Sequence, residues 1–509
     1  MPSETRDRRW IALAVLVAAQ FMVVLDVAIV NVALPSIQTD LHFSEQSLQW
    51  VITAYAIMFG GFLLLGGRMA DLLGRRRLFI AGVALFTLSS LLAGFAWSSG
   101  SLITFRATQG LGGALLAPAA LSILTTTFAE GRERNVALGV WGAVSGSGAA
   151  AGVLLGGFLT SSLDWSWIFF INVPVGIALV AVSPLLLRES RAELGHRTFD
   201  FAGAFTVTSG LMLLVYAMTR ATEIGWGTAE TIGLLAGAVA LILSFVAIEL
   251  RSKAPLLPMR IFRLRSLAGA NVTSFLVGTA LFSQFFLGTL YMQQVLHYSA
   301  LKTGVAYLPL TLTIIALAGI AQALVTRVGV RRVLPVGLAL AAGSLVLLAQ
   351  LPADGHYFWD VFPAFVISAI GLAFTFIPLT IAALMGVQES DAGVASGLLN
   401  TTQQIGGAIG VAAATTIATT FTAHYVDSHA GISAFSGAAL THGFQIAFYV
   451  LAATAAVGAA LAALLIESQP AQAEREPEVG EPQVAVVSLH TPVCRTRRVL
   501  AGRQAGAVG

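Results

Sequence analysis

The segment Gly67-Arg68-Met69-Ala70-Asp71-Leu72-Leu73-Gly74-Arg75-Arg76-Arg77 decides the fold, because it is a short polar stretch between apolar runs at 48–66 and 78–97. Each run has about the 20 residues that a helix needs to cross a bilayer. The glycines permit a tight turn between two helices, and the Asp71 carboxylate is able to pair with arginines or to cap a helix N-terminus. A loop that only fixed topology would use the arginines but would need neither Asp71 nor the glycine spacing. The segment therefore predicts a functional turn between two membrane-spanning helices.

The composition of the whole chain agrees with a membrane protein. Of 509 residues, 57% are hydrophobic and 10% are charged, and the mean hydropathy is +0.83. This balance is typical of polytopic membrane proteins and excludes an ordinary soluble domain. The length criterion gives fourteen candidate helices, at 11–34, 48–66, 78–97, 102–126, 136–160, 165–187, 201–219, 230–249, 267–295, 303–325, 333–351, 358–385, 393–421 and 442–466. We expect an all-α protein with fourteen transmembrane helices.

The positions of lysine and arginine test that count. If both termini lie in the cytoplasm, 25 of the 28 basic residues fall in cytoplasmic segments. Cytoplasmic loops of membrane proteins carry an excess of Lys and Arg, so this distribution supports the fourteen helices and their orientation. The net charge of +3 then reflects topology, and we expect the partners to be the lipid bilayer and small solutes rather than nucleic acid.

The sequence lacks the residues that several classes of protein require. The single cysteine, Cys494, excludes an intrachain disulfide and a cysteine-based metal site. Neither lysine, Lys253 or Lys302, lies in a nucleotide-binding Gly-Lys-Ser/Thr context. We therefore expect no metal and no cofactor, and transport driven by an ion gradient. A membrane-embedded enzyme or sensor is the alternative from another class, but it would need clustered histidines or paired carboxylates in the membrane, and none is visible.

Basic loops recur at similar intervals, which predicts a repeated architecture. The interval from Arg9 to Gly74 is 65 residues, and that from Arg265 to Gly329 is 64. Repeated halves with the substrate path between them are usual in secondary transporters. We expect a cytoplasmic N-terminus (1–10), an N-terminal six-helix half (11–187), a linker with two extra helices (188–266), a C-terminal six-helix half (267–466) and a disordered cytoplasmic tail (467–509).

Asp26 is the one carboxylate well inside a predicted helix, and Arg106 is a second charge inside another. An ionisable residue at membrane depth is costly and is by default a functional hypothesis. At 1.5 Å per residue, Arg106 lies about 6 Å and Asp26 about 13 Å from the outer helix ends. The two could therefore meet directly or through water, with Gln109 on the same helix face as Arg106. Burial favours a neutral acid and a nearby cation favours the carboxylate, so substrate binding could release a proton. The alternative is a structural ion pair that only clamps helices.

These motifs resemble the major facilitator superfamily. The loop from Gly67 matches the pattern G-x-x-x-D-x-x-G-R-[RK], and Leu102–Gly112 matches L-x-x-x-R-x-x-Q-G-x-G. The resemblance implies a cytoplasmic gate latch formed by Gly67, Asp71, Gly74, Arg75 and Arg76, and a role in proton transfer for Arg106. A second copy of the loop keeps Gly329, but Thr326 stands where the acid would be.

More specifically, the chain is similar to the 14-helix drug:proton antiporters. The stretch Leu25–Pro35 carries the Asp, Asn and Ala-Leu-Pro of their first helix, which implies that Asp26 carries the proton. The stretches Trp165–Pro174 and Gly397–Gly407 are also typical of this group. The series Gly148, Gly152, Gly156 and Gly157 resembles the antiporter motif of exporters, with Val153 at its proline position; generic close packing of helices is the alternative explanation.

The resemblance implies a major facilitator fold of two six-helix halves plus a two-helix insert. It implies proton-coupled export of small amphipathic drugs or antibiotics by alternating access, with no enzyme activity. A proton-coupled uptake symporter on the same fold is the nearest alternative. We expect a monomeric multi-pass protein of the bacterial cell (inner) membrane. Candidate substrate-binding residues, each of which could equally be an interhelical tie, are Gln20, Asn31, Gln109, Asn271, Phe282, Gln284, Tyr291, Asn400 and Gln404.

Overall fold

The computed structural model describes residues 2–43, 45–48, 50–129, 131–191, 200–252, 255–429 and 431–467. The tail predicted to be disordered lies outside the described residues except for Glu467. The first part of the chain forms α1 (Pro2–Asp40), α2 (Glu45–Leu48), α3 (Trp50–Leu73), α4 (Arg75–Gly94), α5 (Ser99–Thr127), α6 (Arg132–Ser162), α7 (Trp167–Phe170), α8 (Asn172–Leu186), α9 (Phe201–Ile224) and α10 (Ala229–Glu249).

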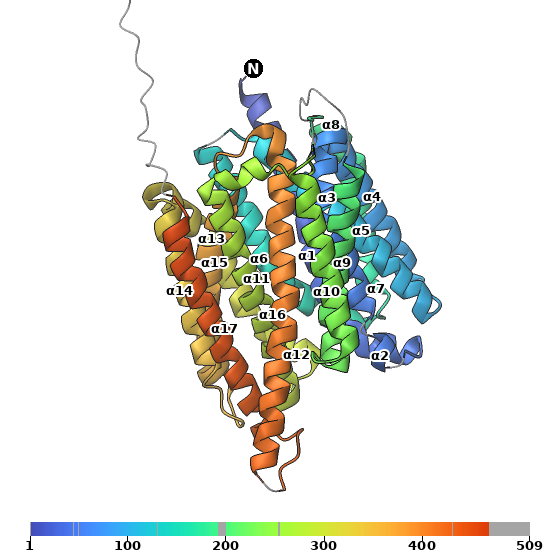
Figure 1. Ribbon diagram of the computed structural model, residues 1–509, viewed down its shortest axis with the longest axis vertical. Helices are drawn as coiled ribbons and strands as arrows, with labels where there is room; N and C mark the ends of the chain where they lie inside the picture. The colour runs from blue at the N-terminus through green and yellow to red at the C-terminus, as the bar shows by residue number, and fades with distance from the viewer. Residues whose placement is uncertain are drawn as a thin grey trace, which may run out of the picture. The chain divides into compact units, whose positions relative to one another are not determined.

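The second part continues the helical architecture (Figure 1). It comprises η1 (Met259–Arg263), α11 (Arg265–Leu290), η2 (Tyr291–Val295), α12 (Ala300–Ala306), α13 (Leu308–Val328), α14 (Val330–Leu348), η3 (Tyr357–Val361), α15 (Phe362–Leu384), η4 (Glu389–Asp391), α16 (Ala392–Ser428) and α17 (Gly437–Leu465). The described residues contain no strand. The expected all-α fold is confirmed.

Thirteen helical stretches of the described residues are long and apolar enough to cross a membrane. The remaining predicted span, 136–160, lies within α6, which has 31 residues. The predicted count of fourteen is therefore met to within one helix. Large apolar side chains on the outside of the molecule, such as Leu185 and Leu464, are 80% and 76% exposed, as lipid-facing positions should be.

Several helices run further than the apolar runs predicted. α3 continues to Leu73, through most of the segment expected as a turn, so only Gly74 separates it from α4. α9 continues to Ile224 rather than 219. α1 continues through Pro35 to Asp40 instead of ending near residue 34, because Ile37 is buried in an apolar cluster with Phe43 and Val51. α16 continues to Ser428 rather than 421. These helices therefore extend beyond the strictly apolar runs.

Helix packing brings the two parts of the chain together. α1 packs on α6, α3 packs on α5, and α11 packs on α16, while α3 also packs directly on α16. The expected insert, α9 and α10, lies beside α3 and α16 (Figure 1). At the loop between α9 and α10, Trp226 Nε1 donates a hydrogen bond to Thr416 Oγ1 of α16 at 2.8 Å. The insert therefore contacts helices from both predicted halves.

Candidate functional site

The two charges expected inside the membrane form a direct ion pair. Arg106 Nη1 of α5 lies 2.6 Å from Asp26 Oδ2 of α1. The Asp26 side chain is 0% exposed and that of Arg106 is 1% exposed. The prediction that the two residues meet is thus confirmed, and their contact needs no bridging water. Removing one partner of such a buried pair is costly, because the remaining charge is left uncompensated.

The guanidinium of Arg106 has further partners besides the carboxylate. Its Nε donates to the backbone oxygen of Val51 at 3.2 Å, and Nη1 donates to Gln109 Oε1 at 2.7 Å. The guanidinium carbon lies 4.4 Å from the ring centroid of Tyr55, a cation–π distance. The amide of Gln109 in turn donates from Nε2 to Asp26 Oδ1 at 2.8 Å. Each of Arg106, Gln109 and Asp26 therefore forms a hydrogen bond with the other two.

Asn172 completes the surroundings of Asp26, and the sequence analysis did not assign it to the site. Its Nδ2 donates to Asp26 Oδ1 at 3.0 Å and to Ser90 Oγ at 3.1 Å. Asn172 begins α8 and is 2% exposed. The available signal was a lone amide in the otherwise apolar run 165–187, but an amide there reads equally well as a tie between helices. The carboxylate thus accepts hydrogen bonds from three side chains, Arg106, Gln109 and Asn172.

The glycines of α6 let α1 approach closely around Asp26. A Cβ atom at Gly148 would lie 2.8 Å from Val24, one at Gly152 would lie 2.7 Å from the backbone oxygen of Leu25, and one at Gly156 would lie 2.9 Å from Ile29. The predicted smooth face is therefore turned toward the α1 segment that carries Asp26. Gly157 differs, since its nearest neighbour is Leu301 of α12.

The Gly67–Arg77 segment, which α3 includes up to Leu73, joins helices that are distant in sequence. Asp71 is fully buried and pairs with Arg75, whose Nη2 lies 2.9 Å from Asp71 Oδ1. The carboxylate also accepts the backbone N–H groups of Gly393 and Val394, each at 3.2 Å, at the start of α16. Both expected roles of Asp71, pairing and capping, are therefore present. The helix that Asp71 caps belongs to the second predicted half.

The neighbouring residues of this loop support the contact. A Cβ atom at Gly67 would lie 2.3 Å from the backbone oxygen of Gly393, so only glycine fits there. Gly74 has φ of 112°, a value that favours glycine. Arg76 donates from Nη1 to the backbone oxygen of Leu187 at 3.2 Å and from its backbone N–H to Glu189 at 3.2 Å. The loop is thus also attached to the end of α8.

The second copy of the loop makes a different set of contacts. Thr326, which occupies the position of the acid, donates to the backbone oxygen of Gln322 and accepts a hydrogen bond from its side chain, both within α13. Arg331 Nε donates to the backbone oxygen of Ala463 at 3.2 Å. Thr326 thus bonds within its own helix, whereas Asp71 bonds to α16.

The nine candidate substrate-binding residues are placed differently from one another. Asn31, Asn271 and Asn400 each donate to the backbone oxygen four residues earlier in their own helices. The other amides and the phenol mostly bond across elements, as Gln20 to Ser145, Gln109 to Asp26, Gln284 to Ser368 and Tyr291 to Pro352. Phe282 lies against Gly407, and Phe282 and Gln404 are half-buried. Asn271 Oδ1 also accepts a hydrogen bond from Thr402 Oγ1 of α16 at 3.1 Å. Five of the nine side chains thus serve as ties between elements.

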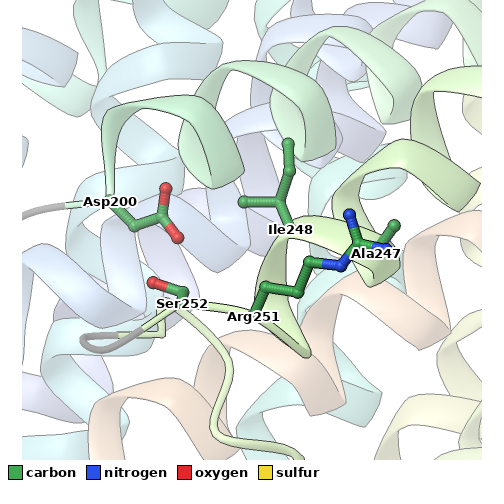
Figure 2. Close-up of a pocket in the computed structure, with 5 residues that line it drawn as sticks. All are labelled: Asp200, Ala247, Ile248, Arg251 and Ser252. Atoms are coloured by element: carbon green, nitrogen blue, oxygen red, sulfur yellow. The ribbon is translucent and has the colours of Figure 1, made fainter.

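Three surface cavities of the described residues are lined by other groups. One of about 320 Å³ lies between the start of α9 and the end of α10 and is lined by Asp200, Ala247, Ile248, Arg251 and Ser252 (Figure 2). There Asp200 caps α9 by accepting the N–H of Gly203 at 2.7 Å. None of the nine candidates lines these cavities.

The chain matches one family model and is similar to several antibiotic resistance or export proteins. A family model described as Major Facilitator Superfamily matches residues 16–411. A puromycin resistance protein of Streptomyces alboniger is 41% identical over 470 residues, covering 92% of this chain and 93% of that protein. A cephamycin export protein of Amycolatopsis lactamdurans is 39% identical, covering 83% of this chain and 90% of that protein. A tetracenomycin C resistance and export protein of Streptomyces glaucescens is 35% identical, covering 81% and 76%.

A solved structure has the same fold. The crystal structure of the human organic anion transporter MFSD10 superposes with a TM-score of 0.64 at 15% sequence identity. The match covers 89% of this chain and 99% of that one.

Proposed function

The chain belongs to the Major Facilitator Superfamily, and from this premise we propose that it exports small amphipathic drugs or antibiotics across the bacterial cell membrane in exchange for protons. The observation that carries the proposal is the buried pair of Asp26 and Arg106. An acid that is fully buried at membrane depth and paired with a cation is suited to binding and releasing a proton. The names of the relatives, which describe resistance or export, favour transport out of the cell.

We infer that the described conformation is closed toward the cytoplasm. The arginine-rich loops mark the cytoplasmic ends of the helices, and at those ends Asp71 binds the first turn of α16. Arg260 supports this contact, because its Nη2 lies 3.0 Å from Asp391 directly before α16. We expect the proton site, which is fully buried in this conformation, to exchange with the outside when the outer ends of the helices open.

The steps of the cycle then follow from the contacts. A proton from the outside neutralises Asp26 and weakens its attraction for Arg106. Because α6 holds the α1 segment around Asp26 through its glycines, a shift of α1 is passed to α6. α6 also packs on α13 and α15 of the other half, so the shift would rearrange the halves and open the contact at Asp71. A cationic or amphipathic cargo entering from the cytoplasm would then favour release of the proton.

The energy source and stoichiometry are part of the proposal. One charge crossing a potential of 100 mV contributes about 2.3 kcal/mol, and the pH difference adds to this. With one acid deep in the membrane, we expect one proton per transported molecule. Flux measurements in reconstituted vesicles should give a proton-to-substrate ratio of one, and a ratio of two would contradict the single site.

The route of the cargo is proposed to lie between the halves, which we place at residues 11–187 and 267–466. The candidate residues with half-buried or exposed side chains, Asn31, Phe282, Asn400 and Gln404, are the ones we expect to contact it. We further propose that the protein acts as a monomer with both termini in the cytoplasm. Labelling of introduced cysteines by a membrane-impermeant reagent, in intact cells and in inverted vesicles, tests that orientation.

Transport into inverted membrane vesicles tests the proposed function. With radiolabelled puromycin as probe and an acidic vesicle interior, we expect accumulation that a protonophore abolishes. Resistance of expressing cells to puromycin, cephamycin, tetracenomycin C and lincomycin then shows which compounds are carried. A proton-coupled uptake symporter would instead release preloaded compound from the same vesicles, and this result would reverse the proposed direction.

A further inference from the structure

The two oxygen atoms of the Asp26 carboxylate have different kinds of partner. Oδ2 accepts a hydrogen bond from the charged guanidinium, with Arg106 Nη1 at 2.6 Å. Oδ1 accepts from two neutral amides, Gln109 Nε2 at 2.8 Å and Asn172 Nδ2 at 3.0 Å. The two oxygens are therefore not equivalent as places for a proton.

A second hydrogen bond, to Ser90, fixes the orientation of the Asn172 amide. Its Nδ2 also donates to Ser90 Oγ at 3.1 Å, and Ser90 Oγ donates to the backbone oxygen of Phe169 at 2.9 Å. Ser90 is fully buried. Rotating the amide by half a turn would place its carbonyl oxygen against the carboxylate, where two acceptors would repel each other. The N–H group of Asn172 thus stays directed at Oδ1.

Arg106, in contrast, has partners that remain if it leaves the carboxylate. Its Nε would still donate to the backbone oxygen of Val51, and its Nη1 would still donate to Gln109 Oε1. The guanidinium would also retain its cation–π contact with the ring of Tyr55. A proton on Oδ1 would meet the N–H groups of both amides. A proton on Oδ2 requires only that Arg106 withdraw.

We infer that Asn172 is a positioning residue that keeps Oδ1 of Asp26 as a fixed hydrogen-bond acceptor and makes Oδ2 the atom that exchanges Arg106 for a proton. In this step an O–H bond forms at Oδ2 and the N–H···O contact from Arg106 breaks; on release both changes reverse. The titratable groups that face Asp26 among the described residues are Arg106 of α5 and Tyr55 of α3. α6 presents glycines there and α8 presents Asn172. The inference rests on the proposed proton coupling.

The protonation of Asp26 can be followed without any cargo. In infrared titrations of the purified full-length protein in lipid nanodiscs, the carbonyl band of the protonated acid is the one that Asp26→Asn removes. With the proton on Oδ2, Oδ1 is the carbonyl oxygen that accepts the N–H of Asn172, and a C=O group that loses a hydrogen bond absorbs at higher frequency. Asn172→Leu should therefore move the carbonyl band of protonated Asp26 to higher frequency. Asn172→Val, which also lacks the N–H donor, should move it in the same direction.

Ser90→Ala provides a milder test, because it leaves Asn172 in place and removes only its support; we expect a smaller shift of the band to higher frequency. The matched controls are Ser344→Ala, a buried serine of α14 that bonds within its own helix, and Gln445→Ala, an amide of α17 that bonds to Leu351. Both should keep the wild-type band position.

The same band position in wild type and all three test variants, or no band that Asp26→Asn removes, would overturn the inference. If melting curves show that the Asn172 variants do not fold, the band position in Ser90→Ala decides the test. Vesicle transport distinguishes this inference from the proposed function. An active Asp26→Asn protein contradicts the proposed function, whereas an inactive one with an unshifted band in the Asn172 variants contradicts only this inference.

Discussion

The Asp71 carboxylate at the end of α3 accepts the backbone N–H of Gly393 at the start of α16, 322 residues further along the chain. The same carboxylate neutralises the buried Arg75. One side chain thus links the end of α3 to the start of α16, which belong to different predicted halves, and compensates a buried charge.

The variant Asp71→Asn should weaken this link. Asparagine retains one acceptor oxygen but removes the negative charge that lies 2.9 Å from Arg75 Nη2, and loss of one partner from a buried pair costs about 3–5 kcal/mol. We expect a several-fold lower rate of puromycin transport in inverted vesicles and a lower melting temperature. Thr326→Ala, at the equivalent position of the second loop, is the matched control and should behave as wild type. Equal loss in both variants would show that Asp71 has no special role.

The variant Gly152→Ala should disturb the contact between α6 and α1. The added Cβ would lie 2.7 Å from the Leu25 backbone oxygen and 2.8 Å from Ala28 Cβ, and overpacking of this kind costs about 1–3 kcal/mol. Because Leu25 precedes Asp26, we expect slower proton-driven transport as well as reduced thermal stability. Gly343→Ala on α14, where a Cβ meets nothing within 4 Å, should change neither quantity. Unchanged transport in Gly152→Ala would contradict coupling through this face.

The substrate preference follows from the charges near the proposed route. The spans 267–295 and 303–325 contain no Asp or Glu, so a second positive charge on the cargo would lack a counter-charge there. We expect expressing cells to gain more resistance to the monocation ethidium than to the dication pentamidine. Cells that produce Asp26→Asn at the same level serve as the reference. Stronger protection against pentamidine would contradict the preference.

The helices and the central pair were predictable because they depend on local properties. Helix positions follow from the length of apolar runs, and the meeting of Asp26 with Arg106 follows from their depths along helices that cross in opposite directions. Asp71 could be expected to pair and to cap, since its arginines and glycines are neighbours in sequence. The extension of α1 to Asp40 was missed, because it depends on the packing of Ile37.

Other parts of the site depend on which helices are neighbours in space. Asn172 joins the site only because α8 begins beside the middle of α1. Likewise, no local pattern states that Asp71 caps α16 rather than a nearer helix. The substrate candidates show the same limit: an amide such as Gln284 that bonds across to Ser368 has the same sequence signature as one that binds cargo.

The measurement that tests the central claim most directly is puromycin accumulation in inverted vesicles with an acidic interior, made from cells expressing wild type or Asp26→Asn at equal levels. Asp354→Asn, at an exposed loop position, is the control. We predict that wild type and the control accumulate puromycin against its gradient, whereas Asp26→Asn only equilibrates it. Accumulation by Asp26→Asn to the wild-type level would contradict the account.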